Sequence, residues 1–140
     1  KTGGKKLEEK INKGDIFYAN LDGALGSEQQ GNRPVLIVQN DIGNKYSPTT
    51  IILPLTKIIN RKHRLPTHFN INKSSKIKCD STILAEQIRV IDKKRLGKKI
   101  GNLDKKAMQI IDNKIQIALG IIEFWQVHNR TLFFIGGKYD

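Results

Sequence analysis

The 140-residue chain contains a single cysteine, Cys79. One thiol can form no intrachain disulfide and cannot build a multi-cysteine metal site. We interpret Cys79 as a small buried or half-buried side chain. The absence of structural disulfides is typical of proteins from a reducing compartment, so the sequence predicts a cytoplasmic protein.

Long apolar runs are missing too. A membrane-spanning helix needs about 20 consecutive apolar residues, and the chain has no such run. It also lacks a basic segment followed by an apolar stretch, which a secretory signal would require. The sequence therefore predicts a soluble protein that does not associate with membranes.

Acidic residues are scarce. There are 13 Asp and Glu against 25 Lys and Arg, giving a net charge of +12. Between Lys57 and Lys99 the chain holds 13 Lys and Arg against three acids, so this segment carries +10 of the +12. Such a field favours a polyanionic partner, and its concentration in one segment favours RNA. An RNP-type aromatic box and a zinc knuckle are both absent, so base reading is expected to fall to loops.

Metal-ligating patterns are absent as well. Hard cations that assist phosphoryl chemistry are bound by gathered carboxylates or histidines. The acids of the central segment form no closely spaced cluster, and no histidine lies at ligand spacing from one of them; they are Asp15, Asp22, Glu28, Asp41, Asp80, Glu86, Asp92, Asp104 and Asp112. We therefore expect chemistry that uses neither a metal nor another cofactor.

The length is that of one domain with a single core. Residues 1–12 are polar and lysine-rich and are expected to form a flexible basic N-terminal arm. Residues 13–124 form the expected domain. Residues 125–140 are an extension of unknown role that contains Trp125 and an apolar run at 132–135.

Most of the domain has the composition of short strands. We expect strands at 15–21, 34–39, 50–55, 67–71, 81–85 and 87–91, the last two being separate or continuous. Phe17 and Tyr18 should lie on opposite faces, and in the strand at 67–71 Phe69 should point inward and His68 outward. Residues 40–44 and 47–48 read as turns, and residues 93–95 and 97–99 as basic connections. Pro54 predicts an edge or a bulge, so that Thr56 would sit where a strand breaks open.

The pattern becomes helical after Asp104, a plausible N-cap. Apolar residues then recur at steps of three and four, as expected of a helix packed on a sheet; they are Met108, Ile111, Ile115, Leu119 and Ile122. Gly120 either ends this helix or lies inside it. The fold class predicted is mainly β with a C-terminal helix: a small, strongly bent antiparallel sheet or barrel.

The stretch from Gly26 to Pro34 contains the main candidate for a functional site. Gly26 and Gly31 bracket four polar residues, which reads as a loop whose backbone can approach a ligand closely. Arg33 follows at the start of an apolar strand. Pro34 biases Arg33 toward an extended conformation. A planar, permanently charged guanidinium held in this way suits a phosphate.

Several segments together resemble the MazF/PemK family of toxin endoribonucleases. These segments are Gly14-Asp15-Ile16-Phe17-Tyr18-Ala19, Gly26-Ser27-Glu28-Gln29, Arg33-Pro34-Val35-Leu36-Ile37-Val38-Gln39-Asn40 and Leu84-Ala85-Glu86-Gln87-Ile88-Arg89. Their order and spacing from about Lys13 to Phe124 match the family too. The resemblance implies a small SH3-like antiparallel β-barrel of the CcdB/PemK kind.

The resemblance also implies a function. Members are sequence-specific, metal-independent toxins that cleave single-stranded mRNA through attack of a 2′-hydroxyl. The expected products are a 2′,3′-cyclic phosphate and a 5′-hydroxyl. Members are homodimers neutralised by an antitoxin with an acidic disordered segment, and they bind DNA together with it. The Gly-Ser-Glu-Gln loop implies a short U/A-rich cleavage site such as UACAU.

The candidate catalytic residues are Arg33 and Thr56, which match the positions that the family uses. Arg33 supplies a fork for the oxygens of a phosphorane, and Thr56 supplies a hydroxyl that can donate or accept. Glu28 is either a supporting carboxylate or a solvated loop acid. The candidate RNA-binding residues are Ser27, Glu28, Gln29, Gln30, Lys57, Glu86 and Gln87.

Histidines are the rival catalysts, because imidazole titrates near neutrality. His63 falls in a basic loop and His128 in the extension, whereas His68 lies on an expected strand. Two rival functions also stand beside the ribonuclease. One is a non-catalytic basic RNA-binding module, and the other is a CcdB-like toxin that poisons gyrase; RNA cleavage and DNA supercoiling assays would separate them.

Overall fold

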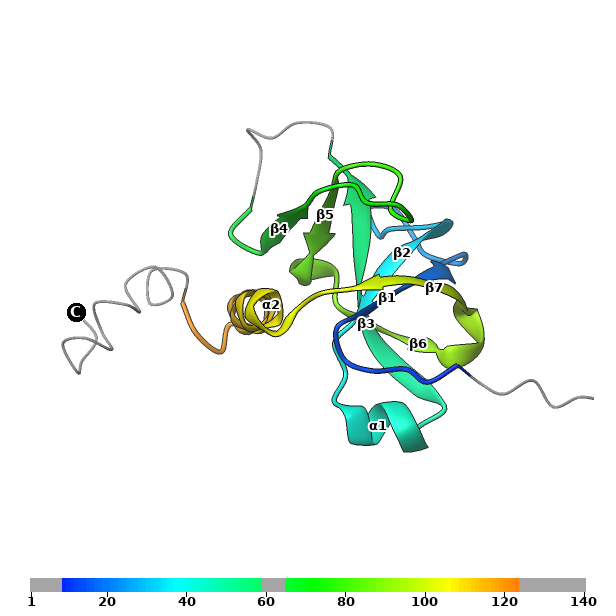
Figure 1. Cartoon of the computed structure of the whole chain (residues 1–140). Coiled ribbons are helices and arrows are strands. Elements are labelled where there is room, and N and C mark those ends of the chain that lie inside the picture. Colours follow the sequence, from blue (N-terminus) through cyan, green and yellow to red (C-terminus); the bar gives the residue numbers. More distant parts are fainter. Residues whose placement is uncertain (1–8, 59–64, 124–140) are drawn as a thin grey trace, which may run out of the picture.

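The computed structural model describes residues 9–58 and 65–123 (Figure 1). His63, His128, most of the predicted arm and the whole of the predicted extension lie outside these residues. The strands are β1 (Asp15–Asn20), β2 (Asn32–Ile37), β3 (Thr49–Lys57), β4 (His68–Ile71), β5 (Ser81–Leu84), β6 (Arg89–Asp92) and β7 (Leu96–Asn102). The helices are α1 (Asp41–Tyr46) and α2 (Lys105–Ala118), with single 3-10 turns η1 (Ala85–Gln87) and η2 (Lys93–Arg95).

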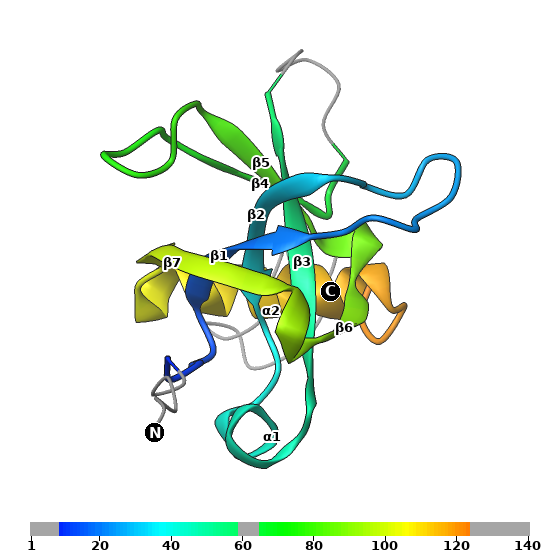
Figure 2. The same ribbon diagram turned by 90° about the vertical axis from the view of Figure 1, so that its right-hand side faces the viewer.

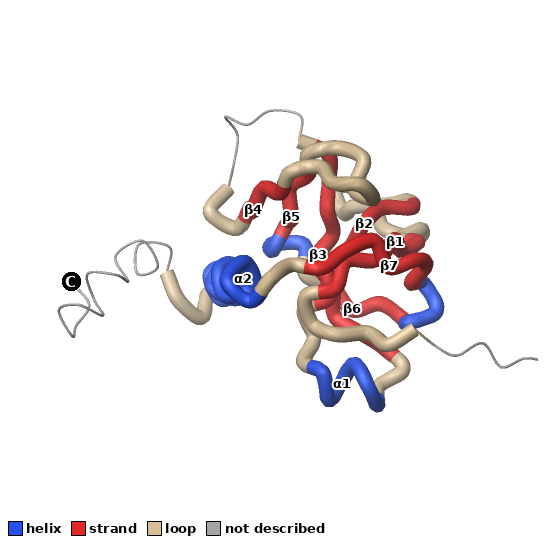
Figure 3. Tube along the Cα trace, viewed as in Figure 1, coloured by secondary structure: helices blue, strands red, loops and turns tan. Residues whose placement is uncertain are grey.

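The strands form one bent antiparallel sheet in the order β4-β5-β3-β2-β1-β7. The long strand β3 lies at the centre of this sheet. One edge of β3 pairs with β2, and the other edge pairs first with β6 and then with β5. Figure 3 shows the strands wrapping around β3, with α2 to one side. The predicted fold class, mainly antiparallel β with a C-terminal helix, is confirmed. Within the described residues β6 and β7 are joined by η2 without pairing, so the barrel is not closed by hydrogen bonds.

Pro54 lies in the middle of β3, where the partner on one edge changes. The pairing with β6 ends at Ile52, and the pairing with β5 begins at Leu55. Pro54 therefore occupies the gap in which a backbone N–H has no ladder partner, and this makes proline tolerable in a central strand. The expectation that the strand breaks open at Thr56 is wrong on the side of β5, where Thr56 pairs with Thr82; on the other side, the pairing with β2 ends at Pro54.

Two apolar clusters cover the two faces of the sheet. One packs beneath α2 and includes Ile16, Leu36, Leu53, Leu55, Ile83, Met108 and Ile111. The other contains Phe17, Ala19, Leu21, Val35, Ile37, Ile52 and Ile91. Phe17 belongs to the second cluster and Tyr18 packs against the first, so the predicted alternation is confirmed. Each fully buried large aliphatic side chain contributes about 1.5–3 kcal/mol.

Helix α2 begins where the sequence predicts. The Asp104 side chain accepts from the N–H of Ala107 at 2.8 Å. Gly120 settles the open question of the helix end, because its φ of 71° stops the helix. The N–H groups of Gly120 and Ile121 donate to the carbonyls of Ile117 and Gln116, which is the Schellman arrangement.

Two predicted connections are elements instead. Residues 40–44, which read as a turn, form the N-cap and first residues of helix α1, because the Asn40 side chain accepts from the N–H of Gly43 and caps the helix. The basic residues 97–99 belong to β7, an edge strand that pairs with β1. Lysines are common on edge strands, where they oppose pairing with other chains. The runs at 81–85 and 87–91 are separate, with η1 between β5 and β6.

Candidate functional site

Arg33 is held in place by two carbonyl groups. Its Nε donates to the carbonyl of Gln30 at 2.8 Å, and an Nη atom donates to the carbonyl of Leu55 at 3.1 Å. The second bond has a local cause. The β2–β3 register pairs Leu36 with Leu53, so Pro34 falls opposite Leu55. Because proline has no N–H, the Leu55 carbonyl accepts from the Arg33 side chain instead.

The same register brings the two predicted catalytic residues together. Val35 pairs with Pro54, and continuing the pairing by two residues places Arg33 opposite Thr56. Residues opposite each other on antiparallel strands share a face of the sheet. Arg33 and Thr56 therefore lie side by side on the face that carries the second apolar cluster, where the ladder between β2 and β3 ends.

The guanidinium retains capacity for a ligand. It has five N–H donors, and the bonds to Gln30 and Leu55 leave three of them. Partial burial lowers the pKa of Arg33 below its ordinary value, because removal from water penalises the charged form. The Thr56 hydroxyl is half-buried and makes no hydrogen bond with any described residue. The pair thus presents cationic donors beside a hydroxyl.

The β1–β2 loop, residues 21–31, is clamped from a distant part of the chain. The Gln87 amide oxygen accepts from the N–H of Gln29 at 2.9 Å, and its nitrogen donates to the carbonyl of Ser27 at 3.2 Å. Gln87 therefore uses both ends of its amide to fix the loop's backbone. Figure 2 shows this loop projecting beyond β1 and β2.

Glu86, beside Gln87 on η1, is tied to β4. One carboxylate oxygen accepts from the Thr67 hydroxyl at 2.8 Å, and the other lies 2.9 Å from His68 Nε2. The N–H of Leu65 donates to His68 Nδ1 at 3.2 Å. A ring that accepts at Nδ1 carries its proton on Nε2, so His68 donates to Glu86. His68 lies on the face opposite Phe69, as predicted, but its side chain is only 14% exposed.

The other predicted residues have distinct surroundings. The Glu28 carboxylate accepts from the N–H of Leu25 at 2.6 Å and so caps a turn within its own loop. The Gln30 side chain is exposed, while its carbonyl supports Arg33. Lys57 is also exposed, but strand alternation points it to the face opposite Thr56.

A hollow of about 500 Å³ lies where the β1–β2 loop meets η1 and β6. It is lined by Gly23, Ala24, Ser27, Glu28, Glu86, Gln87, Ile88 and Arg89. Four predicted RNA-binding residues thus share one concave surface. Arg89 lines it too and was not predicted, although it stands at the end of a segment that carries the family resemblance.

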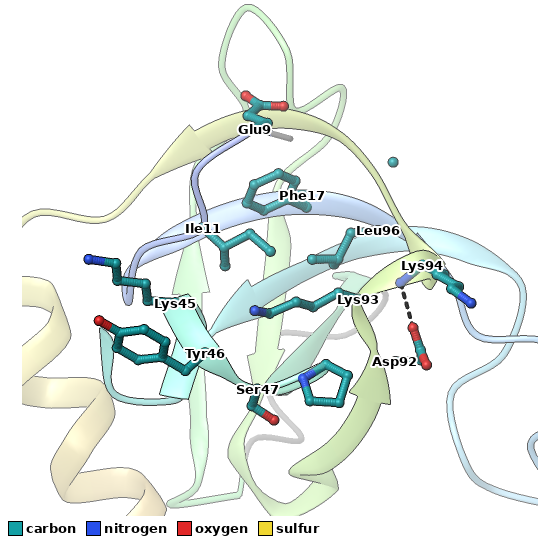
Figure 4. A pocket seen from close by; sticks show the side chains of 12 residues that line it. Glu9, Ile11, Phe17, Lys45, Tyr46, Ser47, Asp92, Lys93, Lys94 and Leu96 are labelled. Atoms are coloured by element: carbon teal, nitrogen blue, oxygen red, sulfur yellow. Dashed lines mark hydrogen bonds between the residues drawn. The ribbon is translucent and has the colours of Figure 1, made fainter. Parts of the chain in front are cut away.

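A second hollow of about 580 Å³ contains none of the predicted site residues. Figure 4 shows Phe17, Ile11 and Leu96 on its floor, with Lys45, Lys93 and Lys94 around it. Ile11 and Leu96 pack against the second apolar cluster, so this hollow is a surface depression over that cluster.

Sequence reasoning also missed Arg95, which anchors the start of the β1–β2 loop. One Nη atom of Arg95 donates to the carbonyls of Asn20 and Asp22, each at 3.0 Å. These residues are more than 70 positions apart in the chain, and no local pattern signals such a contact. The loop is therefore fixed at its start by Arg95 and near its tip by Gln87.

Two further properties concern metals and membranes. Among residues 9–58 and 65–123, no group of three or more His, Cys, Asp or Glu side chains is placed to hold a metal ion. No helix in the same part of the chain has the length and apolar character needed to cross a bilayer.

Related proteins share most of this chain. Residues 12–119 match the family described as the PemK-like, MazF-like toxin of type II toxin–antitoxin systems. Endoribonuclease EndoA of Bacillus subtilis (strain 168) is 49% identical over 115 residues, covering 81% of this chain and 98% of its own. Endoribonuclease MazF of Staphylococcus epidermidis is 50% identical over 115 residues, covering 81% and 95%.

Solved structures show the same fold at lower identity. MazF (Form-I) from Deinococcus radiodurans has a TM-score of 0.67 at 19% identity, covering 81% of this chain and 99% of its own. A mycobacterial endoribonuclease in complex with its cognate antitoxin has a TM-score of 0.65 at 22% identity, covering 80% and 97%. The antiparallel sheet with its C-terminal helix thus has the fold of these proteins. The match over residues 12–119 shows that the chain belongs to the PemK-like, MazF-like toxin family of type II toxin–antitoxin systems.

Proposed function

We propose that the protein is a sequence-specific endoribonuclease toxin that cleaves single-stranded mRNA in the cytoplasm without a metal ion. The observation that carries this proposal is the β2–β3 register, which, continued by two residues beyond Val35 and Pro54, places Arg33 opposite Thr56 on one face of the sheet. The two relatives of about 50% identity, which are named endoribonucleases, support the reaction class.

The proposed reaction uses the ribose 2′-hydroxyl as the nucleophile. Its oxygen bonds to the adjacent phosphorus, and the bond from phosphorus to the 5′-oxygen of the next nucleotide breaks. The proton lost by the 2′-hydroxyl is balanced by the one that the leaving oxygen gains. The products are a 2′,3′-cyclic phosphate upstream and a 5′-hydroxyl downstream.

Arg33 has the role of stabilising the phosphorane. Its remaining N–H groups can donate to the non-bridging oxygens while Gln30 and Leu55 keep the guanidinium oriented. Donors fixed in advance stabilise developing charge without a reorganisation cost. The Thr56 hydroxyl, opposite Arg33, can donate to a phosphate oxygen or accept from the 2′-hydroxyl.

Recognition of the RNA bases belongs to the clamped loop. The hollow between this loop and η1 presents carboxylate and amide groups next to Arg89. Single-stranded RNA is read through hydrogen bonds to the edges of unstacked bases. The roles of Ser27, Glu28, Glu86 and Gln87 in binding rest on this placement. Gln29 and Gln30 lie on the same loop and are expected to contact the RNA outside the hollow. Lys57, on the opposite face, is expected to contact the RNA backbone outside the hollow.

The active form is a homodimer. Val90 on β6 is 59% exposed and pairs with Ile51 on β3, which is also partly exposed. Among the described strands β6 pairs with β3 alone, so its outer edge is open. An exposed apolar pair beside an open strand edge suits a second copy of the chain. Full activity of a species that stays monomeric at micromolar concentration would contradict this assembly.

The inhibitor is an antitoxin with an acidic, disordered segment. A net charge of +12 attracts such a segment and lets it compete with RNA for the same surface. Co-expression with the neighbouring open reading frame should restore growth and give a stable complex. Unrelieved toxicity with no complex would remove that partner from the proposal.

The test of the function is cleavage of a long unstructured RNA in excess EDTA, followed by mapping of the 5′ ends. We expect full activity and cuts within one short sequence, with 5′-hydroxyl ends. Loss of activity on chelation, restored by Mg²⁺ or Mn²⁺, would overturn the metal-free reaction. Absence of RNA cleavage together with relaxed DNA supercoiling would favour a gyrase poison.

A further inference from the structure

The catalytic pair is the start of a longer polar row across the sheet. Thr56 of β3 pairs with Thr82 of β5, and Thr82 pairs with Asn70 of β4. Since facing residues share a side of the sheet, Arg33, Thr56, Thr82 and Asn70 all lie on one face. We call these four residues the polar row. It runs from the proposed catalytic pair to the edge strand β4, which Figure 1 places beside β5.

The far end of the row presents hydrogen-bond donors. The Thr82 hydroxyl donates to the Asn70 amide oxygen at 2.6 Å, and Thr82 is only 7% exposed. A side-chain amide offers an acceptor oxygen and two N–H donors. With the oxygen engaged, the Asn70 nitrogen remains, and it has no partner among residues 9–58 and 65–123. No buried side-chain nitrogen or oxygen in this part of the chain lacks a partner, so this nitrogen is at least partly accessible to solvent.

Resting on the proposed function, we infer that Asn70 is a specificity-determining residue that contacts the RNA. Its amide nitrogen donates to an acceptor oxygen on a base that flanks the scissile phosphate. Thr82 is the positioning residue that keeps the amide oxygen turned away from the RNA. From β2 to β4 the row spans three strand spacings, about 14 Å, which places Asn70 beyond the phosphate that Arg33 holds.

The chemistry of the group limits what it selects. A donor with no available acceptor pairs with a carbonyl oxygen or an unprotonated ring nitrogen of a base and does not pair with an exocyclic amino group. Asn70 should therefore favour, at one flanking position, a base whose contacted edge presents an acceptor such as the carbonyl of uracil or guanine over one that presents an amino group there. The amide places no demand on the ribose at the cleaved bond.

A purely structural role for Asn70 makes a different prediction. Asn70 also satisfies the buried Thr82 hydroxyl, which would otherwise lose its partner. Asn70→Asp keeps an oxygen for Thr82 but removes both N–H donors, so it separates the two roles. Asn72→Asp adds the same charge on an exposed residue just beyond β4 and controls for repulsion of the RNA.

The experiment maps cleavage sites in a random-sequence RNA pool for the wild type and each variant. We expect Asn70→Asp to lower cleavage at preferred sites about tenfold, the loss expected for one hydrogen bond. The base preference should disappear at one flanking position while the cut phosphate stays the same. Thr82→Val should act in the same direction with a smaller effect, Thr82→Ser should restore the wild-type pattern, and Asn72→Asp should keep the preference.

The same variants are compared in binding to a random-sequence single-stranded pool with deoxyribose in place of ribose, which the proposed reaction cannot cut. If the wild type cuts RNA and the Asn70→Asp variant keeps the wild-type base preference at every position, the inference about Asn70 is overturned. The proposed function is not affected by that result. A wild type that binds but does not cut overturns the nuclease, and the base preference of the bound sequences then decides the role of Asn70. A wild type that neither cuts nor binds overturns both.

Discussion

The proposed site has two parts that are held in different ways. Arg33 and Thr56 lie on neighbouring strands, and their positions follow from the register of β2 and β3. The β1–β2 loop is fixed mainly through individual side chains, Gln87 near its tip and Arg95 at its start. Groups that stabilise a transition state must be positioned closely in advance, whereas a loop can adapt to a flexible strand of RNA. We therefore assign the rate of cleavage to β2 and β3 and most of the choice of cleavage site to the loop, with Asn70 of β4 adding a preference at one flanking base.

The largest effect should come from the strand side. Arg33→Ala removes the donors that face the phosphorane and should lower single-turnover cleavage by about 10²-fold or more. Arg33→Lys keeps a charge but loses the planar fork, so it should recover little of the activity. Circular dichroism should show both variants folded. A greater loss in His68→Ala than in Arg33→Ala would overturn the assignment.

Thr56→Val should have the second largest effect. Valine has nearly the shape of threonine and suits a strand, so the fold should be retained. Loss of one hydroxyl should lower cleavage about tenfold with little change in KM. Thr49→Val, at the other end of β3, is the matched control. Unchanged kcat in Thr56→Val would remove Thr56 from the chemistry.

Gln87→Ala tests the loop side. Without the amide, the N–H of Gln29 and the carbonyl of Ser27 lose their partner. We expect KM to rise several-fold and the mapped cleavage sites to broaden, while kcat changes little. Gln109→Ala, on the exposed face of α2, should behave as the wild type. A fall in kcat as large as that of Thr56→Val, at unchanged KM, would erase the distinction between strand and loop.

His68 should have the smallest effect on the reaction. Its ring supports Glu86, on the same turn as Gln87, and lies on the strand farthest from Arg33 in the row. His68→Gln should cost about 1 kcal/mol of the free energy of unfolding, measured with urea. Cleavage should stay within about threefold of the wild type. Loss of one limb of the pH–rate profile would instead make His68 a general acid or base.

Local features of this chain could be predicted from its sequence. The N-cap at Asp104 and the alternation around Phe17 depend on neighbouring residues alone, and both are confirmed. The prediction for Arg33 relied on the Gly-bounded loop and on Pro34, which act within a few residues. Helix α1 was missed because Asn40, Asp41 and Gly43 are turn residues that here cap and form a short helix.

Contacts between distant segments could not be predicted. The clamp between Gln87 and the β1–β2 loop joins residues 58 and 60 positions apart. Thr56 pairs with Thr82 because the pairing partner of β3 changes from β6 to β5 at Pro54. The periodicity of a single strand does not show which strands will pair with it. The polar row likewise appears only once four strands are in register.

The measurement that tests the central claim most directly uses an RNA with a single deoxyribose at the mapped cleavage site. If Arg33 stabilises a phosphorane formed by the 2′-hydroxyl, the wild type should bind this strand as it binds the all-ribose strand but should not cut it. Moving the deoxyribose to a neighbouring nucleotide should restore cleavage. Efficient cutting at the substituted position, in the presence of EDTA, would contradict the account.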